Sequence, residues 1–89
     1  MDNIQNEKQT LILKDRETLE LNGVKSVNSF DVDYLELNTN LSILCVEGNN
    51  LKIEALDHEN QKILLKGRIN GIFYKEEKTS RGFFSGLFK

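Results

Sequence analysis

The chain has 89 residues, of which 38% are hydrophobic and 29% charged, and its formal net charge is −2 at pH 7. This length allows one domain without a second core, and the composition is that of a folded protein and not of a disordered one. The acidic balance excludes an overall basic field of the kind that attracts nucleic acid.

The N-terminal sequence MDNIQNEKQ is polar and acidic and predicts no secretory signal. No apolar run approaches the roughly 20 residues that span a bilayer. The single cysteine, Cys45, cannot form an internal disulfide, which suits a reducing compartment. We therefore expect a cytoplasmic protein with three parts: a disordered polar arm (residues 1–9), a β domain (residues 10–75) and an aromatic and basic tail (residues 76–89).

The β domain opens with two short apolar segments. Residues 10–13 (TLIL) predict a first strand, followed by a charged turn at residues 14–17. Leu19 and Leu21 alternate with polar residues in the next segment. The Asn-Gly pair at positions 22 and 23 then predicts a hairpin, since both central residues of a type I′ turn need positive φ.

The next segment changes its apolar phase. After Val24 and Val27, residues 29–37 (SFDVDYLEL) alternate first through Phe30 and Val32 and then through Leu35 and Leu37. Because side chains alternate between the two faces of a strand, this change predicts a bulge or bend at residues 33–35.

Residues 41–74 are the most informative part of the chain. Short apolar–polar alternations follow one another, closed by glycine, asparagine or acidic clusters, and no helical period appears between them. We predict strands at residues 41–46, 51–55, 63–65 and 72–74, a turn at residues 48–50 and a polar hairpin loop at residues 57–60. Gly67 and Gly71 flank Ile69 and indicate a bulge or tight bend.

These segments predict an all-β fold, a compact antiparallel sheet of about seven strands arranged as a small sandwich or flattened barrel. The alternative is a short stacked-β, solenoid-like unit that polymerises end to end.

The sequence offers no catalytic, cofactor-binding or metal-binding cluster. His58 lies between two acidic residues in the predicted loop, and one His with one Cys is too few for a zinc site. Cys45 lies in the most apolar strand and is interpreted as a core residue. The glycines at 67 and 71 lack the Lys-Ser/Thr ending of a phosphate loop. We expect a protein that is not an enzyme and has no cofactor.

The tail is the candidate contact segment. Its last seven residues hold three of the five phenylalanines, close to basic side chains. On a helix the aromatic and aliphatic residues would share one face. We predict contact with a protein partner or a membrane interface through these residues: Arg81, Phe83, Phe84, Leu87 and Phe88. Self-association is one form of such contact, and capping of an open edge of the chain's own sheet is the alternative.

A small β-barrel that binds nucleic acid is the alternative function. Such a protein interleaves basic and aromatic residues on one strand face. Here the basic residues of the second half of the β domain alternate with isoleucine and leucine, namely Lys52, Lys62, Lys66 and Arg68. We expect no nucleic-acid partner.

Several segments resemble the YabP/YqfC family of sporulation proteins, and most closely its YabP members. Residues 23–31 (GVKSVNSFD) are similar to the family's "GVxxVxSFD" signature, and residues 82–89 (GFFSGLFK) to its terminal "GFFSxLFK". Further similar positions are Gly48-x-x-Leu51, Leu56-Asp57, residues 66–69 and Tyr74, so that the resemblance extends from about residue 10 to the end. The chain departs from the family at residues 38–42, where the turn before the central strand tends to contain glycine.

The resemblance implies a non-enzymatic protein of spore morphogenesis, acting in assembly of the cortex peptidoglycan. It implies production in the mother cell of an endospore-forming bacterium and a position at the cytoplasmic side of the outer forespore membrane. The expected partner is a protein of the forespore envelope, with homo-oligomerisation. The family supplies no catalytic or ligand residues to transfer.

Overall fold

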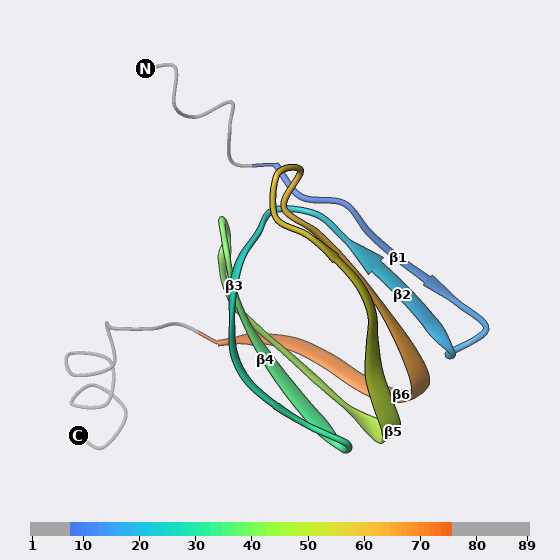
Figure 1. The fold of residues 1–89 in the computed structure, drawn as a ribbon. Coiled ribbons are helices and arrows are strands. Elements are labelled where there is room, and N and C mark those ends of the chain that lie inside the picture. Colours follow the sequence, from blue (N-terminus) through green and yellow to red (C-terminus); the bar gives the residue numbers. More distant parts are fainter. Residues whose placement is uncertain (1–7, 76–89) are drawn as a thin grey trace, which may run out of the picture.

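The computed structural model describes residues 8–75, and the regular structure of this part is a single antiparallel sheet (Figure 1). Its strands run in the spatial order β1-β2-β6-β5-β4-β3, so the sheet does not close into a barrel. The predicted all-β antiparallel fold is confirmed, with six strands where about seven were expected. The strands are β1 (Leu11–Lys14), β2 (Thr18–Leu21), β3 (Val24–Asp31), β4 (Tyr34–Thr39), β5 (Ser42–Asp57) and β6 (Lys62–Lys75).

The long hairpin of β5 and β6 belongs to two layers. At its open end, residues 43–47 pair with residues 71–75, and β5 pairs there with β4 on its other side. At its closed end, residues 52–57 pair with residues 62–66, and β6 pairs there with β2 on its other side. Between these ends the hairpin curves strongly, which brings the β3–β4 layer to face the β1–β2 layer (Figure 1). The chain therefore forms one folded sheet, and not the stacked-β alternative.

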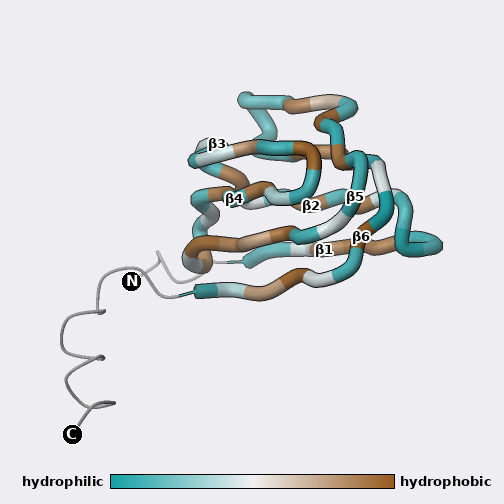
Figure 2. Tube along the Cα trace, turned by 90° about the horizontal axis from the view of Figure 1, so that it is seen from below, coloured by the Kyte–Doolittle hydropathy of each residue, from teal (hydrophilic) through white to brown (hydrophobic). Residues whose placement is uncertain are grey.

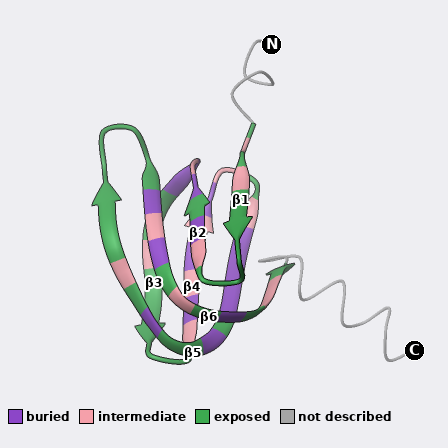
Figure 3. Ribbon diagram, turned by 90° about the vertical axis from the view of Figure 1, so that its right-hand side faces the viewer, coloured by how far each residue is buried: buried purple, intermediate pink, exposed green. Residues whose placement is uncertain are grey.

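The core lies between the two layers and takes side chains from both. The colour of the trace alternates between brown and teal along the strands in Figure 2, as expected where successive side chains point to opposite faces. Burial is concentrated in the inner positions (purple in Figure 3). Each buried aliphatic side chain contributes about 1.5–3 kcal/mol. The core cluster consists of Leu19, Leu21, Val24, Leu35, Leu37, Leu44, Val46, Leu51, Ile63, Leu65 and Ile69.

Two glycines allow the hairpin to bend. Gly67 has φ +136°, and a Cβ there would lie 2.6 Å from the Asn50 carbonyl oxygen. A Cβ on Gly48 would overlap the Arg68 carbonyl oxygen on the neighbouring strand. The β5–β6 register shifts between Glu47 and Gly48 and again between Asn49 and Lys52. The predicted bend at Gly67 is confirmed. The predicted turn at residues 48–50 is wrong: these residues remain in β5, because irregular pairing bends the strand without ending it.

The Asn22-Gly23 pair does not form a hairpin. It leads from β2 in one layer to β3 in the other, and Val24 N–H donates to the Gln61 carbonyl at 3.0 Å. The first hairpin instead closes at the charged turn, as predicted for residues 14–17. There Asp15 and Arg16 have φ of 51° and 58°, and Glu17 N–H donates to the Lys14 carbonyl at 2.9 Å.

Arg16 fixes this turn to the bend in β6. Its Nε donates to the Ile69 carbonyl at 3.1 Å, and the amide of Ile69 donates back to the Arg16 carbonyl at 2.9 Å. A terminal guanidinium nitrogen also donates to Asn70 Oδ1 at 2.8 Å. These bonds explain how a turn without glycine keeps two residues at positive φ.

The phase change in residues 29–37 comes from a tight turn. Val32 and Asp33 join β3 to β4, so the chain reverses in a hairpin turn close to residues 33–35, where a bulge or bend was predicted. The bulges lie earlier, in β3, where the register with β4 shifts at two points, so that Lys25 and Asn28 have no residue directly opposite them on β4. Each bulge adds one residue and shifts the alternation of side chains by one position. Val24, Val27 and Phe30, which are three residues apart, therefore point to the same face of the sheet.

In the turn where the family tends to contain glycine, residues 38–42, Ser42 has φ 124°, a conformation that favours glycine. Its Oγ donates to the Lys75 carbonyl at 2.8 Å, which holds the serine at the start of β5 against the end of β6.

Candidate functional site

The predicted contact residues, Arg81, Phe83, Phe84, Leu87 and Phe88, lie outside the described residues 8–75. Contact through the tail and capping of the chain's own sheet both stay predictions. In the described part, no helix is long and apolar enough to cross a membrane.

His58 lies in the turn between β5 and β6, as predicted. The carboxylate of Asp57 accepts hydrogen bonds from the backbone and side-chain amides of Asn60, at 3.2 and 2.8 Å. These two bonds lower the pKa of Asp57. Among residues 8–75, no group of three or more His, Cys, Asp or Glu residues is placed to hold a metal ion.

Cys45 is fully buried, as predicted, but it points away from the main core. It lies on the outer face of the β3–β4 layer, opposite Glu36 on β4 and Phe73 on β6. The Tyr34 hydroxyl lies 3.2 Å from Cys45 Sγ and 3.0 Å from Glu36 Oε1. Lys75 Nζ lies 3.3 Å from the same glutamate oxygen. This outer cluster therefore links three neighbouring strands.

The cluster shifts two pKa values in opposite directions. The pKa of Tyr34 is raised by the hydrogen bond of its hydroxyl to Cys45, by desolvation, and by its hydrogen bond to Glu36. The hydrogen bond from Tyr34, followed by those from Lys75 and Asn28, lowers the pKa of Glu36, although desolvation opposes this. The folded state thus favours a neutral tyrosine beside an ionised glutamate.

We expect acid to weaken the fold partly through Glu36. Because its pKa is lower in the folded state, its stabilising contribution is present above about pH 4.5 and is lost as the pH falls through the folded-state value. The variant Glu36→Gln should therefore lose less unfolding free energy on acidification than the wild type. Urea unfolding across the acidic range measures this difference.

Glu59→Gln is the control for this experiment, since the Glu59 side chain is exposed in the β5–β6 turn. This variant should follow the wild-type pH dependence. Identical acid slopes for Glu36→Gln and the wild type would show that the Tyr34–Glu36 contact does not contribute to stability.

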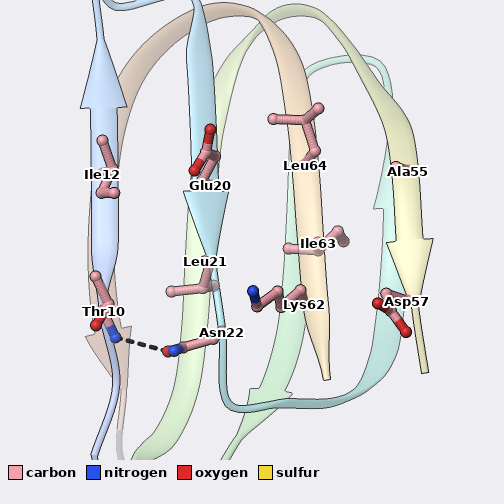
Figure 4. Close-up of a pocket in the computed structure, with 10 residues that line it drawn as sticks. All are labelled: Thr10, Ile12, Glu20, Leu21, Asn22, Ala55, Asp57, Lys62, Ile63 and Leu64. Carbon is pink, nitrogen blue, oxygen red and sulfur yellow. Dashed lines mark hydrogen bonds between the residues drawn. The ribbon is translucent and has the colours of Figure 1, made fainter. Parts of the chain in front are cut away.

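A shallow cavity of about 430 Å³ lies on the β1–β2 layer (Figure 4). One row of its residues crosses four strands in register: Ile12 on β1 opposite Glu20 on β2, then Leu64 on β6, then Ala55 on β5. This row lies on the face away from the core. We call the cavity and this row the outer groove.

Polar residues close one end of the outer groove. Thr10, Asn22, Lys62 and Asp57 form the next row across the same strands, and Thr10 N–H donates to Asn22 Oδ1 at 2.7 Å (Figure 4). An apolar floor with a polar end suits the docking of an apolar side chain of a protein partner, with hydrogen bonds at the rim.

The outer groove was not predicted, but the sequence contains a signal for it. Ile63-Leu64-Leu65 and Leu11-Ile12-Leu13 are runs of three apolar residues within strands. Since successive side chains point to opposite faces, such a run must place an apolar group on the outer face.

Basic side chains also lie on this layer. Lys52 and Lys66 are directly opposite each other on β5 and β6. Acidic side chains accompany the lysines: Lys14 Nζ lies 4.0 Å from Glu20, and Lys52 Nζ lies 3.9 Å from Glu54. The outer face of the β1–β2 layer is therefore mixed in charge.

Comparison with known proteins identifies the family. The model of the YabP family matches residues 5–81. The chain belongs to the YabP family. It is 38% identical over 86 residues to the spore protein YabP of Bacillus subtilis (strain 168), an alignment that covers 93% of this chain and 86% of that protein. The family match includes all six strands, so the resemblance predicted from GVKSVNSFD and the other segments of the β domain is confirmed.

Proposed function

We propose that this chain is a non-enzymatic assembly protein of spore morphogenesis, needed for formation of the spore cortex. The observation that carries the proposal is the similarity to the spore protein YabP along 93% of the chain, which supports a role in sporulation. In this proposal the protein acts in the mother cell, at the cytoplasmic side of the outer forespore membrane, as a scaffold that brings other components together.

The surfaces of the β domain are compatible with assembly. The sheet ends at two strands, β1 and β3, and the outer groove offers an apolar floor with a polar end. An edge strand presents unpaired backbone groups to another chain, and a groove of this kind receives side chains. We propose that the scaffold joins copies of itself through the β domain and contacts a protein of the forespore envelope through the tail.

The tail contact is tested by replacing both Phe83 and Phe84 with alanine. We expect the variant to lose its localisation in sporulating cells and to fail to support cortex formation. Its melting temperature should stay close to that of the wild type, because residues 8–75 have a buried core cluster of their own, between Leu19 and Ile69. A fluorescent fusion in cells that lack the native gene shows the localisation, and electron microscopy shows the cortex.

The double variant Thr79→Ala with Ser85→Ala is the matched control, since it changes the same tail and keeps every phenylalanine. It should localise and function as the wild type does. If the Phe83 and Phe84 variant instead melts far below the wild type, the tail is part of the fold, and contact with an envelope protein is not its role.

A further inference from the structure

We propose that β1 is a self-association surface, through which two copies of this chain pair edge to edge and antiparallel about Ile12. The inference deepens the proposed function by naming the contact between copies, and it depends on that function only for its biological role. The pairing itself can be tested on the purified chain.

β1 is a terminal strand with a regular, accessible edge. Its register with β2 runs without a shift from Leu11 opposite Leu21 to Lys14 opposite Thr18. Its side chains are apolar at three successive positions, and Ile12 and Leu13 remain 42% and 40% exposed. A flat edge with exposed apolar residues is the kind that pairs with another strand.

The hydrogen-bonding direction of the β1 backbone follows from its neighbour. The amide of Asn22 donates to the Thr10 carbonyl at 3.3 Å, so Thr10 faces β2. Because hydrogen-bonded and non-bonded pairs alternate in antiparallel pairing, Ile12 faces β2 as well. Leu11 and Leu13 therefore direct their N–H and C=O groups outward. These four groups form the edge that a second strand would bond.

The other free edges in residues 8–75 are less suited to pairing. β3 contains the two bulges at Lys25 and Asn28, which interrupt a ladder. The part of β5 beyond Lys52 has a register shift between Ile53 and Ala55 and exposes charged side chains. The end of β6 is contacted by Gln9, whose side-chain oxygen accepts a hydrogen bond from the Tyr74 hydroxyl. β1 has no register shift, and its one charged side chain is that of Lys14, at its end.

A second copy fits this edge because the edge complements itself. Antiparallel pairing about a twofold axis at Ile12 places Leu11 of one copy opposite Leu13 of the other, and Ile12 opposite Ile12. Lys14 then lies opposite Thr10, so that no like charges are paired. Within its own chain, Leu13 lies opposite the fully buried Leu19, on the face of the sheet that covers the core. Leu11 and Leu13 of the second copy would therefore extend this apolar face beyond β1.

A cysteine at the twofold position tests both the pairing and its register. Ile12 opposite Ile12 is a non-hydrogen-bonded pair, with Cα atoms about 4.5 Å apart, within the range that a disulfide spans. Full-length Ile12→Cys should form a covalent dimer under mild oxidation, seen on a non-reducing gel. Cys45 does not interfere, because it is fully buried.

Lys14→Cys is the matched control, on the same face of the same strand. In the proposed register its two copies lie four positions apart along the strand, about 13 Å at 3.3 Å per residue, which is too far for a disulfide. It should remain uncrosslinked. Equal crosslinking of both variants, or none at Ile12→Cys, would overturn the proposal.

The backbone is tested independently by Leu13→Pro. Proline removes an N–H that points outward, so the β1–β2 hydrogen bonds remain and the fold should survive, whereas the contact between copies loses a donor and meets the proline ring. By size-exclusion chromatography with light scattering, the full-length wild type should have about twice the 10.2 kDa chain mass at high concentration. Leu13→Pro should have the mass of one chain.

Leu13→Ser controls for the lost side chain, since it keeps the N–H and should still dimerise, more weakly than the wild type. A wild type that is monomeric up to millimolar concentration, or a Leu13→Pro protein that still dimerises, overturns the pairing through β1. Either result leaves the localisation and cortex experiment on Phe83 and Phe84 unaffected, so failure of this inference and failure of the proposed function are distinguishable.

Discussion

Gly48→Ala should destabilise the protein by about 3 kcal/mol, a large fraction of the total for a domain of this size. The added methyl group would overlap the Arg68 carbonyl oxygen and lie 2.9 Å from Leu51 Cδ2. The carbonyl belongs to the backbone of β6 and cannot rotate away as a side chain can. To relieve the overlap, β5 and β6 must separate where the hairpin bends, which disturbs both layers. Thermal unfolding should show a melting temperature lower by about 15 °C.

Gly71→Ala is the control for this substitution. Gly71 lies on β6 next to the same bend, but the nearest atom to an added Cβ is the Glu47 side-chain oxygen at 3.8 Å, an ordinary contact. This variant should melt within a few degrees of the wild type. If both variants melted alike, the close approach of Gly48 to Arg68 would not be what holds the bend.

Leu44→Ala should cost about 2–5 kcal/mol. Leu44 is fully buried in the core cluster and lies on β5, opposite Leu37 of β4 and Tyr74 of β6. Removing three carbons at this position leaves a cavity between the layers that the neighbouring strands cannot close. Urea unfolding gives the free-energy difference.

Leu56→Ala makes the same chemical change on the same strand, at a side chain that is 39% exposed. It should cost less than about 1 kcal/mol, since little apolar surface returns to water. Equal losses for the two variants would mean that the core is not concentrated between the layers at Leu44.

The sequence predicted the strands well where the local pattern alone determines them. The alternation of Leu19 with Leu21, the polar turn around His58 and the burial of Cys45 all agree with the structure. These features depend on side-chain periodicity and turn composition, which are local properties of the chain.

The errors come from tertiary contacts. Asn22-Gly23 has the composition of a hairpin turn, yet the strands it joins pair with β6 and β4, far apart in the sheet. Residues 48–50 have the composition of a turn, but pairing with β6 keeps the chain extended. Local composition permits both outcomes, and only the partner strand decides between them.

The candidate surfaces were predictable in part. Apolar runs of three within a strand indicate that Ile12 and Leu64 face outward, but only the register of four strands shows that they form one groove. The openness of the β1 edge likewise follows from the strand order of the whole sheet, which no local pattern at residues 11–14 reveals.

The central place of the β5–β6 hairpin determines when the protein can fold during its synthesis. β2 is made early, but its partner is the segment of β6 at residues 63–66, more than forty positions later in the chain. The first hairpin alone is too small to be stable in water. Its apolar residues must therefore remain accessible until the ribosome has made most of the domain, when β5 and β6 can pair and cover them. Folding should accordingly begin only after β6 has been made, and a ribosome stalled before residue 62 should carry a nascent chain that proteases cleave readily.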